Sequence, residues 1–177
     1  DEVSQKKGIV IYNFNSAHID RAAGEFGTLG FQPHARYYTM QGDRPVTKGS
    51  FREVMPIRSF VKEFIAKSLI LRRLIPIYQP QEQDIELACA LIAEIKRKVW
   101  EQLPAARFIV SIWLQQEQHK IKACLERRGV EVWDFGGIQR DPSMVTHWDG
   151  WHPSAAENKF YAKLLADKLR AVTTDSK

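Results

Sequence analysis

The sequence predicts an α/β protein built on a parallel β-sheet, and three observations lead to this fold class. Three short, mostly apolar runs rich in β-branched residues have the composition of strands buried in such a sheet: 8–14, 108–113 and 130–135. Stretches with the helical spacing of apolar residues separate these runs. The resulting order of strands and helices is that of successive β-α units with right-handed crossovers. We expect a single domain over residues 1–177.

The composition is that of an ordinary globular protein, with 44% apolar and 27% charged residues. No apolar run approaches the length of a membrane span, so we predict no membrane-spanning segment. The formal net charge of +5 permits an acidic partner. However, the basic residues are scattered and do not interleave with aromatic ones, so nucleic-acid binding is the weakest hypothesis and we predict no such partner. The cellular compartment stays open.

The first strand, 8–14, leads into a segment that we interpret as a polar loop, 15–21. Ligands bind at the carboxyl ends of strands in open α/β sheets, which makes this loop a candidate site. Its His18 either lines a pocket or makes a loop hydrogen bond. Further on, a strand-like piece, a turn at 41–44 and a returning segment predict a small hairpin. We interpret residues of about 25–55 as a peripheral insertion.

The apolar spacing then predicts three helices before the last one. The first spans about 57–74, and we expect its apolar residues to pack in the core and its basic end to be solvated. A helix lying on a membrane surface is the alternative. The second spans about 84–103 and stops at Pro104. The third spans about 115–128 and is closed by Gly129.

Cysteine and histidine residues give no sign of a metal site. Cys89 and Cys124 each fall on the apolar side of a predicted helix, so we expect two small buried hydrophobic side chains. Two cysteines are too few for a disulfide framework and lack metal-binding spacing. His34, His119 and His147 have no companions at metal spacing. We therefore assign no metal and no cofactor.

The most informative stretch precedes the last helix and reads Asp149-Gly150-Trp151-His152-Pro153. Ser154 is the expected N-cap of that helix, and Glu157 follows at capping-box spacing. Asp149 could accept a hydrogen bond from one ring nitrogen of His152, which would leave the other free to act as a general base. The alternative is a histidine that only satisfies a loop carbonyl. Trp151 either stacks on a substrate or packs under the helix.

These residues resemble the SGNH/GDSL hydrolase family. Asp149-Gly150-Trp151-His152-Pro153 is similar to the family's last motif block, which supplies the acid and the base of a Ser-His-Asp triad. Residues 12–16, Tyr-Asn-Phe-Asn-Ser, look like its Gly-x-Asn-Asp block, which implies an oxyanion-hole role for Asn15. Residues 10–14, together with His18 and Arg21, are also similar to a bacterial subgroup with a Tyr-Gly-Phe…His…Arg pattern. The resemblance implies a flavodoxin-like, three-layer α/β/α sandwich.

The chain departs from the family pattern in three places. Asn13 stands where the family has Gly, and Ser16 stands where it has Asp. The Gly-Asp-Ser block that carries the nucleophile occurs nowhere in the sequence. The first account is a domain truncated at its N-terminus, with the serine upstream in a longer protein. The second is a divergent, inactive member, and Ser16 is a weaker candidate for a nucleophile within the chain.

The resemblance thus predicts an ester hydrolase that acts on a small-molecule, carbohydrate or lipid ester. A non-catalytic binding module on a degenerate hydrolase fold is the alternative. A truncated parallel sheet would also leave a strand edge exposed at residues 8–14, so we expect self-association through that edge.

Overall fold

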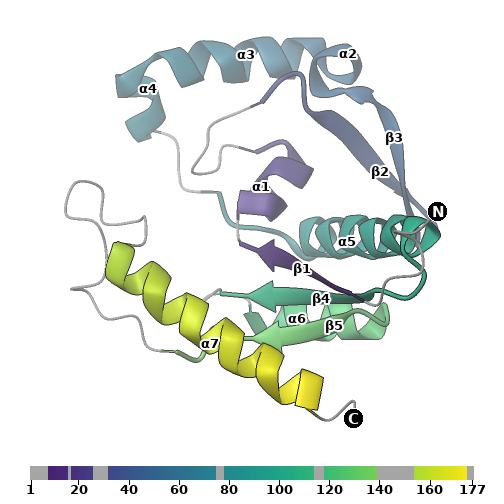
Figure 1. Ribbon diagram of the computed structural model, residues 1–177. Helices are drawn as coiled ribbons and strands as arrows, with labels where there is room; N and C mark the ends of the chain where they lie inside the picture. Colours follow the sequence, from purple (N-terminus) through teal and green to yellow (C-terminus); the bar gives the residue numbers. More distant parts are fainter. Residues whose placement is uncertain are drawn as a thin grey trace. The chain divides into compact units, whose positions relative to one another are not determined.

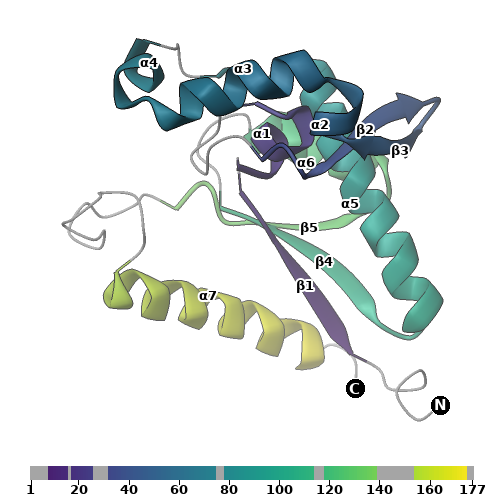
Figure 2. The same cartoon turned by 90° about the horizontal axis from the view of Figure 1, so that it is seen from above.

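The computed structural model describes residues 8–15, 17–25, 32–74, 78–113, 118–138 and 154–174. They belong to two units, one ending at Gly137 and one beginning at Ile138, and each is described by itself (Figures 1 and 2). The elements of the first unit are β1 (Ile9–Phe14), α1 (Ala17–Ala23), β2 (Arg36–Gln41), β3 (Arg44–Ser50), α2 (Phe51–Val54), α3 (Pro56–Lys67), α4 (Leu69–Leu74), α5 (Glu82–Gln102), β4 (Arg107–Ile112), α6 (Gln118–Arg127) and β5 (Glu131–Asp134). The second unit contains α7 (Ala155–Thr174).

The three predicted apolar runs form one parallel sheet in the order β1-β4-β5, which confirms the α/β class. Ile11 of β1 pairs with Ile109 of β4, and Ile109 pairs in turn with Glu131 of β5. The central strand β4 is buried from Phe108 to Ile112. β1 pairs with one described strand only, and of its residues only Phe14 is fully buried. The first strand is therefore less buried than its apolar composition predicted. Self-association through its edge stays a prediction.

Helices α1, α5 and α6 pack with one face of the sheet and form the core of the first unit. The core residues include Phe14 and Ile19 near the first strand, and Val110 and Ile112 in the central strand. Cys89 of α5 and Cys124 of α6 are both buried free thiols, as predicted. Gly129 follows α6 with a φ of 67°, the left-handed conformation expected after a helix end.

The predicted hairpin is present as the antiparallel pair β2 and β3, with Gly42 at φ 59° in its turn. It forms a sheet of its own and packs against α5. Tyr38 and Met40 of β2 pack against the core cluster. The hairpin therefore covers part of α5 and does not extend the parallel sheet.

The single helix expected over residues 57–74 is in fact divided. Within this range, α3 and α4 are separate helices, interrupted at Ser68, whose backbone is extended. The expected packing was also wrong. Phe60 and Phe64 are exposed, whereas Ser59 and Lys62 on the opposite side of α3 are buried.

The buried Lys62 explains why α3 turns its polar side inward. Its ammonium donates to the carbonyl oxygen of Gly24 at 2.6 Å and to a carboxylate oxygen of Glu25 at 2.7 Å. Arg58, one turn earlier, pairs with the same carboxylate. Burial lowers the pKa of Lys62, and Glu25 opposes that shift. These contacts bind α3 to the segment that follows α1.

In the second unit, α7 begins where the sequence predicted. The hydroxyl of Ser154 accepts a hydrogen bond from the backbone N–H of Glu157 at 3.2 Å, which confirms the N-cap. The Glu157 carboxylate is buried and accepts from the Tyr161 hydroxyl at 2.6 Å, one turn along the helix. None of the helices in the described ranges is long and apolar enough to cross a bilayer.

Candidate functional site

The carboxyl end of β1 carries the first group of predicted site residues. Asn15 directly follows the strand, and its side chain is exposed. The segment beyond it was expected to be a loop, but α1 begins at Ala17. The backbone N–H of His18 donates to the carbonyl of Asn15 at 3.1 Å, which closes this tight strand-to-helix connection. Asn15 and His18 are therefore held close together.

The imidazole of His18 lies between two aromatic rings of β1. Its ring centroid is 5.4 Å from that of Tyr12 and 5.5 Å from that of Phe14. The backbone N–H of Asn15 donates a long hydrogen bond of 3.5 Å to Nδ1, and the Tyr12 hydroxyl is 3.4 Å from the same atom. Because a backbone amide can only donate, Nδ1 is the acceptor and the neutral ring carries its proton on Nε2. Of the two interpretations of His18, the loop hydrogen bond is thus present.

The surroundings of His18 favour this neutral form. Burial lowers the pKa of His18, and the positive charge of Arg21 lowers it further. Burial also raises the pKa of the Tyr12 hydroxyl, so both groups are uncharged near neutral pH. The Nε2–H group can donate to a carbonyl or an oxyanion, but in this tautomer Nε2 cannot accept a proton.

His18 should make stability depend on pH in a predictable direction. Its pKa lies below the ordinary 6.5 in the folded chain, so the unfolded chain binds the proton first as pH falls. We expect the free energy of unfolding to decrease as pH falls through 6.5 towards the lower folded-state pKa, and this part of the decrease to vanish in His18→Gln. Urea unfolding at several pH values across this range measures the free energy of unfolding. His119→Gln, on the exposed side of α6, is the control, and an unchanged pH dependence in His18→Gln would contradict the prediction.

A polar connection joins the ends of β1 and β4. The Ser111 hydroxyl, buried in the central strand, donates to the side-chain oxygen of Asn13 at 3.4 Å and accepts from the Trp113 indole at 3.2 Å. The Trp113 ring stacks on Phe135 beyond β5, with centroids 4.2 Å apart. Ser111 is therefore a buried serine whose hydroxyl has hydrogen-bond partners, and not an exposed nucleophile. Sequence reasoning missed this connection because no motif links residues of different strands.

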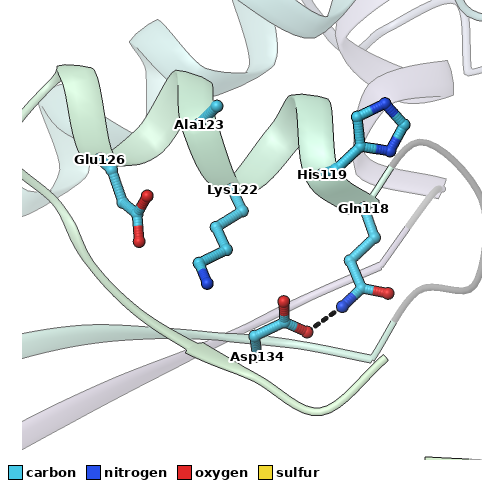
Figure 3. A pocket seen from close by; sticks show the side chains of 6 residues that line it. All are labelled: Gln118, His119, Lys122, Ala123, Glu126 and Asp134. Carbon is cyan, nitrogen blue, oxygen red and sulfur yellow. Dashed lines mark hydrogen bonds between the residues drawn. The ribbon is translucent and has the colours of Figure 1, made fainter. Parts of the chain in front are cut away.

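A polar hollow of about 430 Å³ lies between α6 and the end of β5 (Figure 3). The Gln118 amide donates to the Asp134 carboxylate, which also accepts from the backbone N–H of Gly136 at 3.0 Å. Neither Asn15 nor His18, the two predicted site residues that the structure describes, lines it. Its described lining carries both cationic and acidic groups, and the sequence signal for it is limited to a carboxylate at a strand end. The lining residues are Gln118, His119, Lys122, Ala123, Glu126 and Asp134.

The other predicted site residues lie outside the part of the chain that the structure describes: Ser16, Asp149, Trp151 and His152. Their assignments stay predictions. Within the described ranges, no three His, Cys, Asp or Glu side chains gather so that they could hold a metal ion. In comparisons with known proteins, no family model, no curated protein and no solved structure matches this chain.

Proposed function

We propose that this chain is the acid–base part of a serine ester hydrolase of the SGNH/GDSL type, on a flavodoxin-like α/β/α sandwich. The observation that carries the proposal is the position of Asn15. It is an exposed amide at the carboxyl end of a parallel strand, where the resemblance expects the oxyanion-hole donor. The start of α7 at the Ser154 cap, directly after Asp149-Gly150-Trp151-His152-Pro153, adds support.

The proposed reaction follows acyl-enzyme chemistry. A serine hydroxyl attacks the ester carbonyl while His152 takes its proton, and Asp149 orients the imidazole and stabilises its charged form. The Asn15 amide donates to the oxyanion of the tetrahedral intermediate. His152 then returns the proton to the departing alcohol, and water releases the acid by the reverse sequence. In this proposal His18 keeps its loop hydrogen bond at Nδ1 and also lines the substrate pocket, where its Nε2–H is a donor.

The serine itself is the open part of the proposal. The sequence has no Gly-Asp-Ser, so we place the nucleophile upstream of residue 1 in a longer protein, with Ser16 as the candidate within the chain. The substrate class is a small-molecule, carbohydrate or lipid ester. No cofactor takes part in this chemistry.

Labelling with a fluorophosphonate, read by peptide mass spectrometry, tests the proposal. In a protein that contains the nucleophile, we expect one serine to react and His152→Ala to abolish the reaction, because the serine then lacks its base. His119→Ala removes an exposed histidine of α6 and should leave labelling intact. Labelling of this chain alone would place the nucleophile within it, at Ser16 if that peptide carries the label.

A chain extended upstream to include a Gly-Asp-Ser block distinguishes the two accounts of the missing motif. Labelling that appears only in the extended chain supports an upstream serine. If neither protein is labelled, the hydrolase proposal fails, and the alternative of a non-catalytic binding module takes its place.

A further inference from the structure

The most unusual surface of the first unit is an apolar one on α3 and α4. Ile57, Phe60, Val61 and Phe64 recur at the spacing of a single helix face, yet they are 80%, 69%, 48% and 62% exposed. Ile70 and Leu74 of α4 are each 74% exposed. We call the four residues of α3 the apolar face. Soluble proteins rarely leave contiguous apolar patches uncovered, and larger ones mark interaction sites.

The orientation of α3 is fixed by contacts on its other side. Ser59 and Lys62 are buried there, and Lys62 and Arg58 both bind Glu25. Rotating the helix to bury its phenylalanines would pull these groups apart and leave the Glu25 carboxylate and the Gly24 carbonyl unpaired. In Figures 1 and 2, α3 runs on the side of the first unit away from the parallel sheet. The local packing therefore turns the apolar face outward.

Basic residues outnumber acidic ones in the segment that carries this face. Residues 51–74 contain six basic side chains, Arg52, Arg58, Lys62, Lys67, Arg72 and Arg73, and two acidic ones, Glu53 and Glu63. The segment thus holds most of the chain's formal net charge of +5. Both glutamates already have partners. The Glu53 carboxylate accepts a hydrogen bond from the backbone N–H of Ser50, and the Glu63 carboxylate pairs with Arg52. Lys67 and Arg73 are exposed, and within the described residues no carboxylate pairs with either.

We propose that the apolar face docks on the surface of an anionic lipid bilayer, with α3 lying in the plane of the membrane. An amphipathic helix with bulky apolar residues on one side and cationic residues beside them is suited to this position. The phenylalanines enter the acyl boundary, while Lys67 and Arg73 extend towards the lipid headgroups. This inference is independent of the proposed hydrolase activity.

Charge complementarity favours an anionic bilayer over a second copy of the chain as the partner of the apolar face. Two copies joined through the apolar face would bring two positive rims together, and like charges at an interface oppose association. An anionic bilayer supplies both an apolar interior and negative charge. Binding should therefore need both the apolar residues and the cations, and should weaken as salt rises.

Flotation of the purified chain with lipid vesicles tests the proposal. We expect the chain to float with pure phosphatidylglycerol vesicles and to stay largely unbound with pure phosphatidylcholine vesicles. Phe60→Ser/Phe64→Ser should weaken binding by about tenfold or more, because each phenylalanine loses apolar burial. Lys67→Glu/Arg73→Glu should weaken binding to phosphatidylglycerol without changing the fold, since both side chains are exposed.

Two matched variants serve as controls. Phe160→Ser removes a part-exposed phenylalanine from α7, and Lys48→Glu/Lys98→Glu reverses two exposed lysines on β3 and α5; both should float as the wild type does. Circular dichroism checks that each variant is folded. The proposal fails if the wild type does not float with phosphatidylglycerol, or if a folded Phe60→Ser/Phe64→Ser variant floats as well as the wild type. A wild-type dimer that the same variant converts to a monomer, with no lipid binding, would instead make this face a self-association surface.

Discussion

Gly24→Ala is expected to lower the free energy of unfolding by about 2 to 5 kcal/mol. Gly24 has a φ of 66°, which costs an alanine energy before any contact is considered. A Cβ atom there would also lie 2.1 Å from Cε1 and 2.4 Å from Cζ of Phe51, far inside van der Waals contact. Phe51 is 3% exposed, and its ring packs edge-on against Tyr37 at a centroid distance of 5.2 Å. The ring therefore has little room to move.

Gly42→Ala provides the control for the backbone cost. Gly42 has a similar φ of 59°, but a Cβ atom there would meet nothing within 4 Å. We expect this variant to lose only about 1 to 2 kcal/mol. Urea unfolding of both variants separates the cost of the left-handed backbone from that of the contact with Phe51. Equal losses in the two variants would show that the ring moves aside without cost.

The parallel sheet was predictable because each of its strands carries its own signal. The central run that became β4 is apolar and β-branched, since a strand between two others with its side chains in the core admits little else. The end of α6 was equally predictable, since Gly129 takes the positive φ that the position after a helix requires.

The orientation of α3 was not predictable by the same reasoning. Periodicity shows which side chains share a helix face, but not which face turns inward. Here a lysine and a glutamate 37 positions apart determine the orientation of α3. Lys62 binds Glu25 on the buried side of the helix, so Phe60 and Phe64 are exposed on the other side. Two residues so far apart in the sequence form no local pattern from which their contact could be predicted.

The candidate site was likewise predictable only in part. The end of an apolar strand was enough to make Asn15 and His18 candidates, because ligands favour that edge of a parallel sheet; their roles stay predictions. The tautomer of His18 depends on a hydrogen bond from the Asn15 backbone, which only the geometry of the strand-to-helix turn reveals. The polar hollow beside α6 combines a helix and a strand end and has no motif at all.

Asn15→Ala is expected to reduce kcat for ester hydrolysis by about two to three orders of magnitude in the protein that carries the nucleophile. The Asn15 amide is proposed to bind the oxyanion, which exists only after attack on the carbonyl. KM should therefore change little, because the substrate carbonyl does not depend on this donor in the ground state. The side chain is exposed, so the variant should also fold normally.

Asn13→Ala is the matched control, because Asn13 lies two residues earlier on the same strand and occupies the position where the related motif has Gly. Its amide oxygen accepts from Ser111 and has no proposed role in the reaction, so kcat should stay within a few-fold of the wild type. Steady-state kinetics with a chromogenic ester measures both variants. A raised KM with unchanged kcat in Asn15→Ala would mean that Asn15 binds the substrate and not the oxyanion, since only a donor that acts in the transition state lowers kcat alone.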